Sequence, residues 1–278
     1  MNGNSRDYGS WIPAGAIRAL DLITIVLITL TLAANNWFSP KVTAAVGAVM
    51  VIVLLFTLYM QAARSRMSGG LDGMMTEMSD LTLSKLPLEA EDEAGDTDDT
   101  DGGEDEPAGL RILDVGCFTG RLSVRTAERF GSARVKGVDG WQSGGSEAQC
   151  VSNASAEGFS DRVSFETADL AGLEYPDGSF DAAVSCFGFK RYKGSADKKA
   201  LLEESLRVVK KGGAFAFTDS FGDQRTYGDI VGYLEALKER LDIAELHYVP
   251  KVERMDFVPV LLRAPWLLMD TGLIYGVR

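Results

Sequence analysis

The sequence predicts an α/β domain with a mostly parallel, doubly wound sheet, preceded by a transmembrane helical hairpin. From Gly109 onward, short apolar runs alternate with segments of helical pattern, which is typical of βαβ units. Two long apolar stretches come before this region. We therefore expect three parts: a membrane anchor at 1–66, a juxtamembrane segment with an acidic disordered linker at 67–108, and the α/β domain at 109–278.

The membrane anchor is predicted from the apolar stretches at about 17–38 and 42–63. The second carries no charged residue and is apolar on every face, and about 20 such residues suffice to cross the hydrocarbon core of a bilayer. A buried pair of core helices is an alternative for both stretches, and a cleaved signal peptide is one for the first. Asp21 interrupts the first stretch, which also begins late for a signal peptide.

The orientation of the hairpin follows from its flanking basic residues. Arg6 and Arg18 lie before the apolar part of the first stretch, Arg64 and Arg66 follow the second, and Lys41 is the only basic residue in the turn. Basic residues accumulate on the cytoplasmic side of membrane proteins. We therefore expect an integral membrane protein whose α/β domain faces the cytosol.

The segment at 88–108 is acidic and of low complexity. It has almost nothing to bury, so we expect a disordered linker. An acidic metal-binding loop is the alternative, but the spacing of a calcium loop is not met. A short helix is possible before the linker, through Met74, Met75 and Met78.

The bulk composition excludes several classes of function. The formal net charge is −12, with 40 acidic and 28 basic residues, and no basic stripe offers a nucleic-acid partner a surface. The three cysteines are widely spaced and there is one histidine. We therefore expect reduced thiols, no disulfide framework and no metal site.

The stretch Leu110–Gly120 is predicted to be a buried strand followed by a tight turn framed by Gly116 and Gly120. A helix at Arg121–Phe130 follows, and helix N-termini favour anionic groups. Such a unit is typical of a nucleotide-cofactor cradle in which side chains at the glycines would block the ligand. The spacing is Gly-x-x-x-Gly, not the Gly-x-Gly-x-x-Gly of dinucleotide binders, so NAD is the weaker hypothesis.

The rest of the domain is predicted as alternating elements, in which Gly212 and Gly213 end a helix. The expected strands are Leu110–Val115, Ala133–Val138, Val163–Thr167, Asp181–Cys186, Ala214–Asp219, Ile243–Pro250 and Leu273–Val277. The expected helices are Arg121–Phe130, Ser146–Glu157, Ala196–Lys210 and Asp229–Leu241.

Five segments occur in an order and spacing that resemble the class I S-adenosylmethionine (SAM)-dependent methyltransferases of the small-molecule, type 11 sort. They are Ile112–Gly120, Val138-Asp139, Ala168–Leu170, Tyr175–Asp181 and Leu206–Gly213. The resemblance covers Gly109 to about Gly222 and implies a Rossmann-like seven-stranded sheet, SAM as the cofactor and methyl transfer as the reaction. The family usually has Gly where Phe118 stands. That ring either narrows the cradle or covers the methionine end of the cofactor.

The resemblance also implies roles for individual residues. Asp139 takes both ribose hydroxyls, Asp169 takes the adenine amine with Leu170 packed on the ring, and Asp114 lies near the methionine amine. Trp141 lies against the adenine or simply packs, and the aspartates have turn or capping roles as alternatives. The complete set of expected cofactor-binding residues is Asp114, Gly116, Cys117, Phe118, Gly120, Asp139, Trp141, Asp169, Leu170 and Ser185.

No catalytic residue is assigned from the sequence. Segment 185–191 follows the fourth strand and should lie beside the transferred methyl group. The acid–base candidates near strand ends are Asp219, Ser220, Tyr227 and His247. Methyl transfer needs a strong base only if the acceptor must lose a proton. The apolar segment at 255–270 either covers the sheet or lies in a membrane interface.

The sequence therefore predicts a membrane-anchored methyltransferase that transfers a methyl group from SAM to an unidentified small-molecule or lipid-like acceptor, with no nucleic-acid partner. A catalytically inactive SAM-fold scaffold or sensor at the membrane is the alternative from another class. An NAD-dependent reductase is a third hypothesis.

Overall fold

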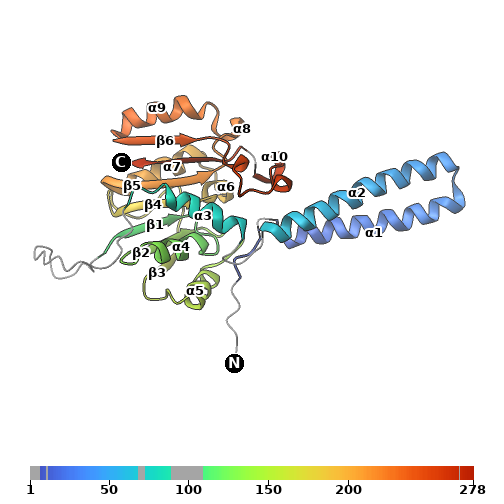
Figure 1. Ribbon diagram of the computed structural model, residues 1–278, viewed down its shortest axis with the longest axis horizontal. Helices are drawn as coiled ribbons and strands as arrows, with labels where there is room; N and C mark the ends of the chain where they lie inside the picture. Colours follow the sequence, from blue (N-terminus) through green and yellow to red (C-terminus); the bar gives the residue numbers. More distant parts are fainter. Residues whose placement is uncertain (1–6, 11, 68–72, 89–108, 269) are drawn as a thin grey trace, which may run out of the picture. The chain divides into compact units, whose positions relative to one another are not determined.

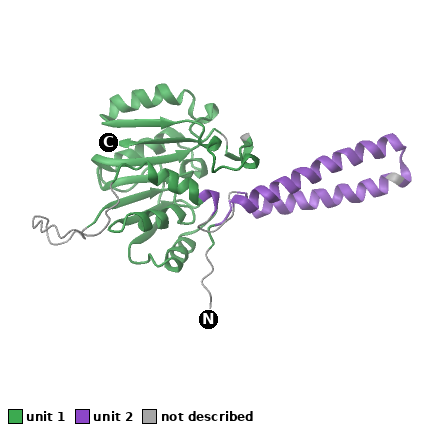
Figure 2. Ribbon diagram, in the orientation of Figure 1, with its two compact units in different colours: residues 1–8, 76–278 green, residues 9–75 purple. Residues whose placement is uncertain are grey.

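The computed structural model describes residues 7–10, 12–67, 73–88, 109–268 and 270–278. The chain forms two compact units, one made of residues 9–75 and the other of residues 1–8 together with 76–278 (Figure 2). The expected acidic linker lies, apart from Leu88, outside the described residues.

The unit of residues 9–75 is a helical hairpin. Helix α1 spans Ala14–Trp37 and α2 spans Pro40–Met67 (Figure 1). The Oγ1 atoms of Thr24 and Thr57 lie 2.9 Å apart between the helices, and Gln61 Nε2 donates to Asp21 Oδ1 at 2.7 Å. Such polar contacts commonly stabilise the association of helices in apolar surroundings.

Both helices of the hairpin are long and apolar enough to cross a membrane by length and composition. The spans are Ala14–Ala34 and Pro40–Met67, and only 6% of the most apolar window of each is buried. Core helices of a water-soluble protein would be mostly buried. Large apolar side chains are instead exposed along both helices, among them Leu22, Ile25, Leu32, Ile52 and Leu55.

The second unit is built on a seven-stranded sheet of order β3-β2-β1-β4-β5-β7-β6 (Figure 1). Strands β1 to β5 pair in parallel, and β7 pairs antiparallel with β5 and β6. The order reverses between β1 and β4, and ligands of such sheets bind beyond the carboxyl ends of the strands at that point. The strands are β1 Arg111–Val115, β2 Arg134–Asp139, β3 Val163–Thr167, β4 Phe180–Cys186, β5 Val209–Asp219, β6 Glu245–Val249 and β7 Gly272–Val277.

Helices cover both faces of this sheet, so the core has two parts. One cluster joins Leu113 and Phe215 to Leu206 and Leu234 of α7 and α9. The other joins Phe165 to α4 and α5. The helices are α3 Met74–Ser84, α4 Arg121–Arg129, α5 Glu147–Ala156, α6 Gly188–Arg191, α7 Lys198–Arg207, α8 Gln224–Tyr227, α9 Ile230–Leu241 and α10 Pro265–Leu268, with short 3-10 turns η1 Val252–Arg254 and η2 Val260–Leu262.

The prediction that Gly212 and Gly213 end a helix was wrong. Helix α7 ends at Arg207, and both glycines lie within β5. Gly212 has φ +79° and donates its N–H to the carbonyl of Arg278 at 2.6 Å. The register of β5 against β4 shifts in this region. The glycines therefore allow an irregularity in a strand.

Helix α3, expected in the juxtamembrane segment, packs into the α/β unit. Thr82 and Thr218 of β5 share a buried hydroxyl–hydroxyl hydrogen bond of 2.7 Å, and Met78 and Leu83 are at most 1% exposed. From Thr76 onward the chain clusters with the α/β unit. The acidic stretch thus connects α3 to β1 of the same unit, instead of connecting the hairpin to the domain.

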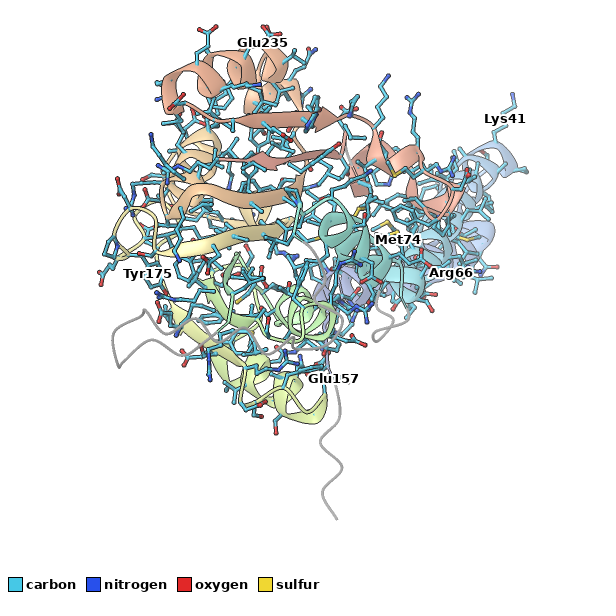
Figure 3. All side chains as sticks on the ribbon, turned by 60° about the vertical axis from the view of Figure 1, so that its left-hand side comes forward. Lys41, Arg66, Met74, Glu157, Tyr175 and Glu235 are labelled. Carbon is cyan, nitrogen blue, oxygen red and sulfur yellow. The ribbon has the colours of Figure 1, made fainter. Side chains whose placement is uncertain are left out.

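The residues before the hairpin also belong to the α/β unit. Thr119 Oγ1 donates to the carbonyl of Tyr8 at 3.1 Å, and the Arg121 guanidinium lies 4.7 Å from the Tyr8 ring centroid. The Tyr8 hydroxyl donates to Glu157, which is labelled in Figure 3 at the end of α5. Arg121 Nη1 also donates to Thr76 Oγ1 at 2.8 Å. One arginine of α4 therefore contacts chain from before and after the hairpin.

Candidate cofactor-binding site

The turn after β1 needs its two glycines for backbone conformation and internal packing. Gly116 and Gly120 have φ of +77° and +79°, a region that favours glycine. A Cβ on Gly116 would lie 2.3 Å from the Cα of Gly188, and one on Gly120 would lie 2.9 Å from the Phe165 ring. The missing side chains therefore make room for the protein's own atoms, in addition to any ligand.

Asp139, at the end of β2, ties this turn to the loop that follows it. Its Oδ2 accepts from the Phe118 N–H at 3.0 Å and its Oδ1 accepts from the Trp141 N–H at 2.6 Å. Burial raises the pKa of Asp139, and these backbone hydrogen bonds oppose the rise. Each oxygen keeps a second lone pair, because a carboxylate can accept about four hydrogen bonds.

Asp114 of β1 carries a buried oxygen that has no hydrogen-bond partner in the described chain. Its Oδ2 accepts from Ser123 Oγ at 2.5 Å, whereas its Oδ1 accepts from nothing. The residue is 1% exposed. Burial raises its pKa to about 7, Asp139 adds to the rise, and Arg191 opposes it. An unpaired buried acceptor is costly, so this oxygen favours a ligand donor.

Comparison with known proteins agrees with this geometry. Residues 112–213 match the family model described as a methyltransferase domain. An arsenite methyltransferase of Aquipseudomonas alcaligenes is 35% identical over 126 residues, which is 42% of this chain and 34% of that protein. A demethylmenaquinone methyltransferase of Thermus thermophilus is 36% identical over 108 residues, 39% of this chain and 46% of that protein.

The chain contains a class I SAM-dependent methyltransferase domain. Among solved structures, a geranyl diphosphate methyltransferase in complex with GPP and sinefungin matches with a TM-score of 0.47 and 15% identity, over 73% of this chain and 78% of that one. The matched regions span about a third to a half of the two curated relatives.

The methyltransferase domain offers groups that fit its cofactor, S-adenosylmethionine. The unpaired Asp114 Oδ1 suits a buried ammonium donor, and the remaining lone pairs of Asp139 suit hydroxyl donors. Phe118 adopts φ +55°, which is why the family usually has Gly there. Its carbonyl accepts from the Trp141 indole Nε1 at 2.7 Å.

Three of the expected cofactor-binding residues direct their side chains into the protein. Cys117 is 5% exposed within the α4–α5 core cluster, and Leu170 is 2% exposed within the other. Ser185 is fully buried and donates to the carbonyl of Val115 at 2.7 Å. Leu170 therefore packs in the core, and the expected packing of its side chain on an adenine ring is not supported, because its apolar surface is already covered.

Trp141 and Asp169 have the local roles that the sequence left as alternatives. Trp141 is half-buried and packs against the α4–α5 core cluster. Asp169 is exposed, and its Oδ1 accepts from the Ala171 N–H and from the Tyr192 hydroxyl, each at 3.0 Å. Neither contact excludes a cofactor, so the cofactor contacts of Trp141 and Asp169 stay predictions.

Arg191 of α6 is the site residue that sequence reasoning missed. Its guanidinium lies 4.2 Å from the Phe118 ring centroid, and Nη2 donates to the carbonyl of Cys186 at 3.4 Å. Burial lowers its pKa, while Asp139 and Asp114 oppose the change. The sequence signal for this role is a basic residue shortly after β4, in a segment that also contains the aromatic residues Phe187 and Phe189.

The structure brings three of the four acid–base candidates together. Asp219, Ser220 and Tyr227 line one cavity at the carboxyl end of β5. His247 lies on β6 at the sheet edge, with its side chain 53% exposed and its ring 4.9 Å from that of Tyr275. The histidine is therefore separate from the candidate site.

The apolar segment at 255–270 is partly cover and partly exposed surface. Among its described residues, Val258 and Leu262 are fully buried. Val260, Leu261 and Trp266 are 78%, 39% and 62% exposed. The buried side chains agree with a covering role, and the membrane-interface alternative stays a prediction.

Proposed function

We propose that this protein is a membrane-anchored methyltransferase that transfers a methyl group from SAM to a membrane-resident, lipid-like acceptor at the cytosolic face. The observation that carries the proposal is that the residues on both sides of an apolar helical hairpin belong to the same compact unit as the methyltransferase domain.

This arrangement restricts how the hairpin can meet a membrane. Residues 7–8 and 76–278 form one unit, so both ends of the hairpin lie in one compartment. An even number of crossings is then required, which the two apolar helices provide. Arg64 and Arg66 lie in the last turn of α2, whereas only Lys41 lies near the turn between the helices. This bias favours the cytosol for the domain.

The case for a lipid-like acceptor rests on the anchor and on surface composition. The two relatives are named for acceptors as different as arsenite and demethylmenaquinone. Similarity of the domain therefore does not identify the class of acceptor. The described part of the α/β unit exposes five large apolar side chains, of which three are Val260, Leu261 and Trp266. Such a patch with a tryptophan suits contact with a lipid surface.

The proposed roles of the site residues follow from their geometry. SAM, when bound, would supply a methyl group activated by its sulfonium: the acceptor's nucleophilic atom would bond to the methyl carbon as the carbon–sulfur bond breaks, and the demethylated thioether would leave. Asp139 would hold the ribose hydroxyls, Asp114 the amine and Arg191 the carboxylate of the cofactor. The protein's contribution is alignment and exclusion of water, which are worth several kcal/mol.

Calorimetry with the full chain in lipid nanodiscs tests the cofactor site. Asp139→Asn should weaken SAM binding about tenfold or more, equivalent to about 1.4 kcal/mol, because two buried hydroxyl donors lose a charged acceptor. Asp197→Asn is the matched control, since Asp197 merely caps α7. Equal losses in both variants would refute the role of Asp139.

Turnover with methyl-labelled SAM tests the acceptor class. Nanodiscs carrying a membrane lipid extract should yield labelled lipid with the wild-type chain and much less with Asp139→Asn. Label confined to a water-soluble extract would contradict a membrane-resident acceptor. SAM binding without transfer to either extract would favour the scaffold or sensor hypothesis.

A further inference from the structure

A cavity lined by polar and charged residues lies at the carboxyl end of β5, beside the candidate cofactor site. Its volume is about 170 Å³, room for several waters or one small functional group. It is lined by Lys190, Lys198, Asp219, Ser220, Asp223, Thr226 and Tyr227. These residues come from α6, α7, the end of β5 and α8, all within the α/β unit.

Two hydroxyl groups in this cavity are buried without a hydrogen-bond partner in the described chain. They are Ser220 Oγ and the Tyr227 hydroxyl, on residues 5% and 1% exposed. Leaving a buried hydroxyl unpaired costs about 1–3 kcal/mol. Burial and the nearby Asp219 raise the pKa of Tyr227, so its hydroxyl stays a neutral donor. Both groups are therefore positioned for a ligand.

The two carboxylates of the cavity are already engaged by protein donors. Asp219 accepts from the N–H groups of Lys190 and Ser220 at 2.9 and 2.6 Å. Asp223 accepts from the Arg225 N–H at 3.1 Å and from Thr226 Oγ1 at 2.8 Å as it caps α8. Each carboxylate therefore already accepts two hydrogen bonds from the protein.

The two lysines add donors and positive charge. Both are half-buried, and burial lowers the pKa of each while Asp219 opposes the change. Lys198 Nζ donates to the carbonyl of Tyr192, and an ammonium has three N–H donors. Two lysines against two aspartates leave the cavity nearly neutral but rich in donors.

We propose that this cavity binds the singly charged oxyanion of the methyl acceptor, either a carboxylate or a phosphodiester. An oxyanion accepts from both hydroxyls and from the ammonium groups, whereas a multiply charged anion would meet the two aspartates without further compensation. That the oxyanion belongs to the acceptor rests on the proposed function. The position supports it, because Lys190 directly precedes Arg191 and Asp219 acts electrostatically on both.

The test uses acetate and dimethyl phosphate as probes, titrated separately into the full chain in neutral detergent without SAM. Saturable binding should appear by calorimetry and as a rise in melting temperature. Lys198→Met and Tyr227→Phe should each weaken binding at least tenfold. Tyr227→Phe should melt at the same or a higher temperature than wild type, because the hydroxyl it removes has no partner.

Tyr233→Phe is the matched control. The Tyr233 hydroxyl lies outside the cavity and donates to Glu203 Oε1 at 2.8 Å. This variant should therefore lower the melting temperature and leave probe affinity unchanged. Tighter binding of dimethyl phosphate identifies a phospholipid headgroup as the oxyanion source, and tighter binding of acetate identifies a carboxylate acceptor.

The proposal fails if neither probe binds saturably, or if Tyr227→Phe melts earlier and keeps full affinity. Either result would mean that the cavity holds only water and the hydroxyl is structural. SAM affinity measured on the same samples separates the two proposals. Probe binding without SAM binding would overturn the proposed function but not the oxyanion site, and the reverse would overturn only the oxyanion site.

Discussion

Asp114 and Asp139 are both carboxylates at strand ends, but their oxygens are used differently. Both oxygens of Asp139 hold backbone N–H groups of Phe118 and Trp141. One oxygen of Asp114 has no partner in the described chain. A substitution of Asp139 therefore disturbs the backbone of two loops as well as ligand binding. A substitution of Asp114 removes an oxygen that is free to bind the ligand, so its effect on affinity is more direct.

The affinity for SAM should rise with pH between about pH 5 and 8. The pKa of Asp114 is about 7 in the folded protein, against 3.8 ordinarily, because burial disfavours its charge. A ligand ammonium favours the ionised form, so binding below pH 7 releases a proton from Asp114. Calorimetry in two buffers of different ionisation enthalpy measures that release.

Asp114→Asn is the control for this pH dependence. The variant cannot release the proton, and any titration of the ligand itself is common to both proteins. The same pKa shift makes wild-type stability fall as pH rises from about 4 to 7, since the folded state holds a proton that the unfolded state has lost. Identical proton release in both proteins would contradict the role given to Asp114.

At the residue scale, the sequence predicts chemistry at strand ends better than it predicts where side chains point. The placement of Asp139 at the end of β2 follows from strand periodicity. The inward direction of Cys117 and Leu170 depends on the core clusters in which they pack. The approach of Arg191 to the Phe118 ring depends on how α6 packs over the turn. No local pattern encodes that packing, so Arg191 was missed.

At the scale of elements, local patterns predicted the parallel strands well: β1 and β4 are apolar runs buried on both faces, and β3 alternates buried and less buried residues. Val163–Thr167 was predicted at its observed bounds. The predicted end of a helix at Gly212 was wrong, because β5 already begins at Val209. The glycine allows an irregularity within that strand. The docking of α3 was missed because its partner Thr218 lies 136 positions from Thr82.

The contact between α3 and β5 should show strong energetic coupling. Thr82→Val and Thr218→Val should each cost about 1–3 kcal/mol of unfolding free energy, because each removes the buried hydrogen bond between the two hydroxyls. The double variant should cost clearly less than the sum, since both polar groups are then gone. Denaturant unfolding of the full chain provides the double-mutant cycle, and strictly additive losses would contradict the hydrogen bond.

At the scale of the whole molecule, the sequence predicted a hairpin and an α/β domain but placed the boundary between them differently. Composition marks the acidic stretch as a natural linker. The structure shows that α3, which precedes this stretch, belongs to the α/β unit. A fragment starting at Gly109 would lack α3, and with it the buried side chains of Met78 and Leu83. The part of the α/β unit that these side chains cover would then be exposed.

A topology experiment tests the two-crossing arrangement. Tags placed at the N-terminus and the C-terminus should react with an impermeant reagent from the same side of sealed vesicles, because both flanks of the hairpin belong to one unit. A cysteine in place of Ser39, in the turn between α1 and α2, should react only from the opposite side. Labelling of the three positions from one side would show that the hairpin does not cross the membrane.

The contacts of Tyr8 have a consequence for the order in which the protein is made. Tyr8 leaves the ribosome early, but the hydroxyl of Thr119 that binds its carbonyl lies 111 positions later. The neighbouring Asp7 pairs with Asn153, 146 positions later. At about 5–20 residues per second, both apolar helices emerge well before either partner exists. If the proposed anchor inserts as it emerges, insertion precedes completion of the methyltransferase domain, because Asp7 and Tyr8 pair with residues that are made after the hairpin.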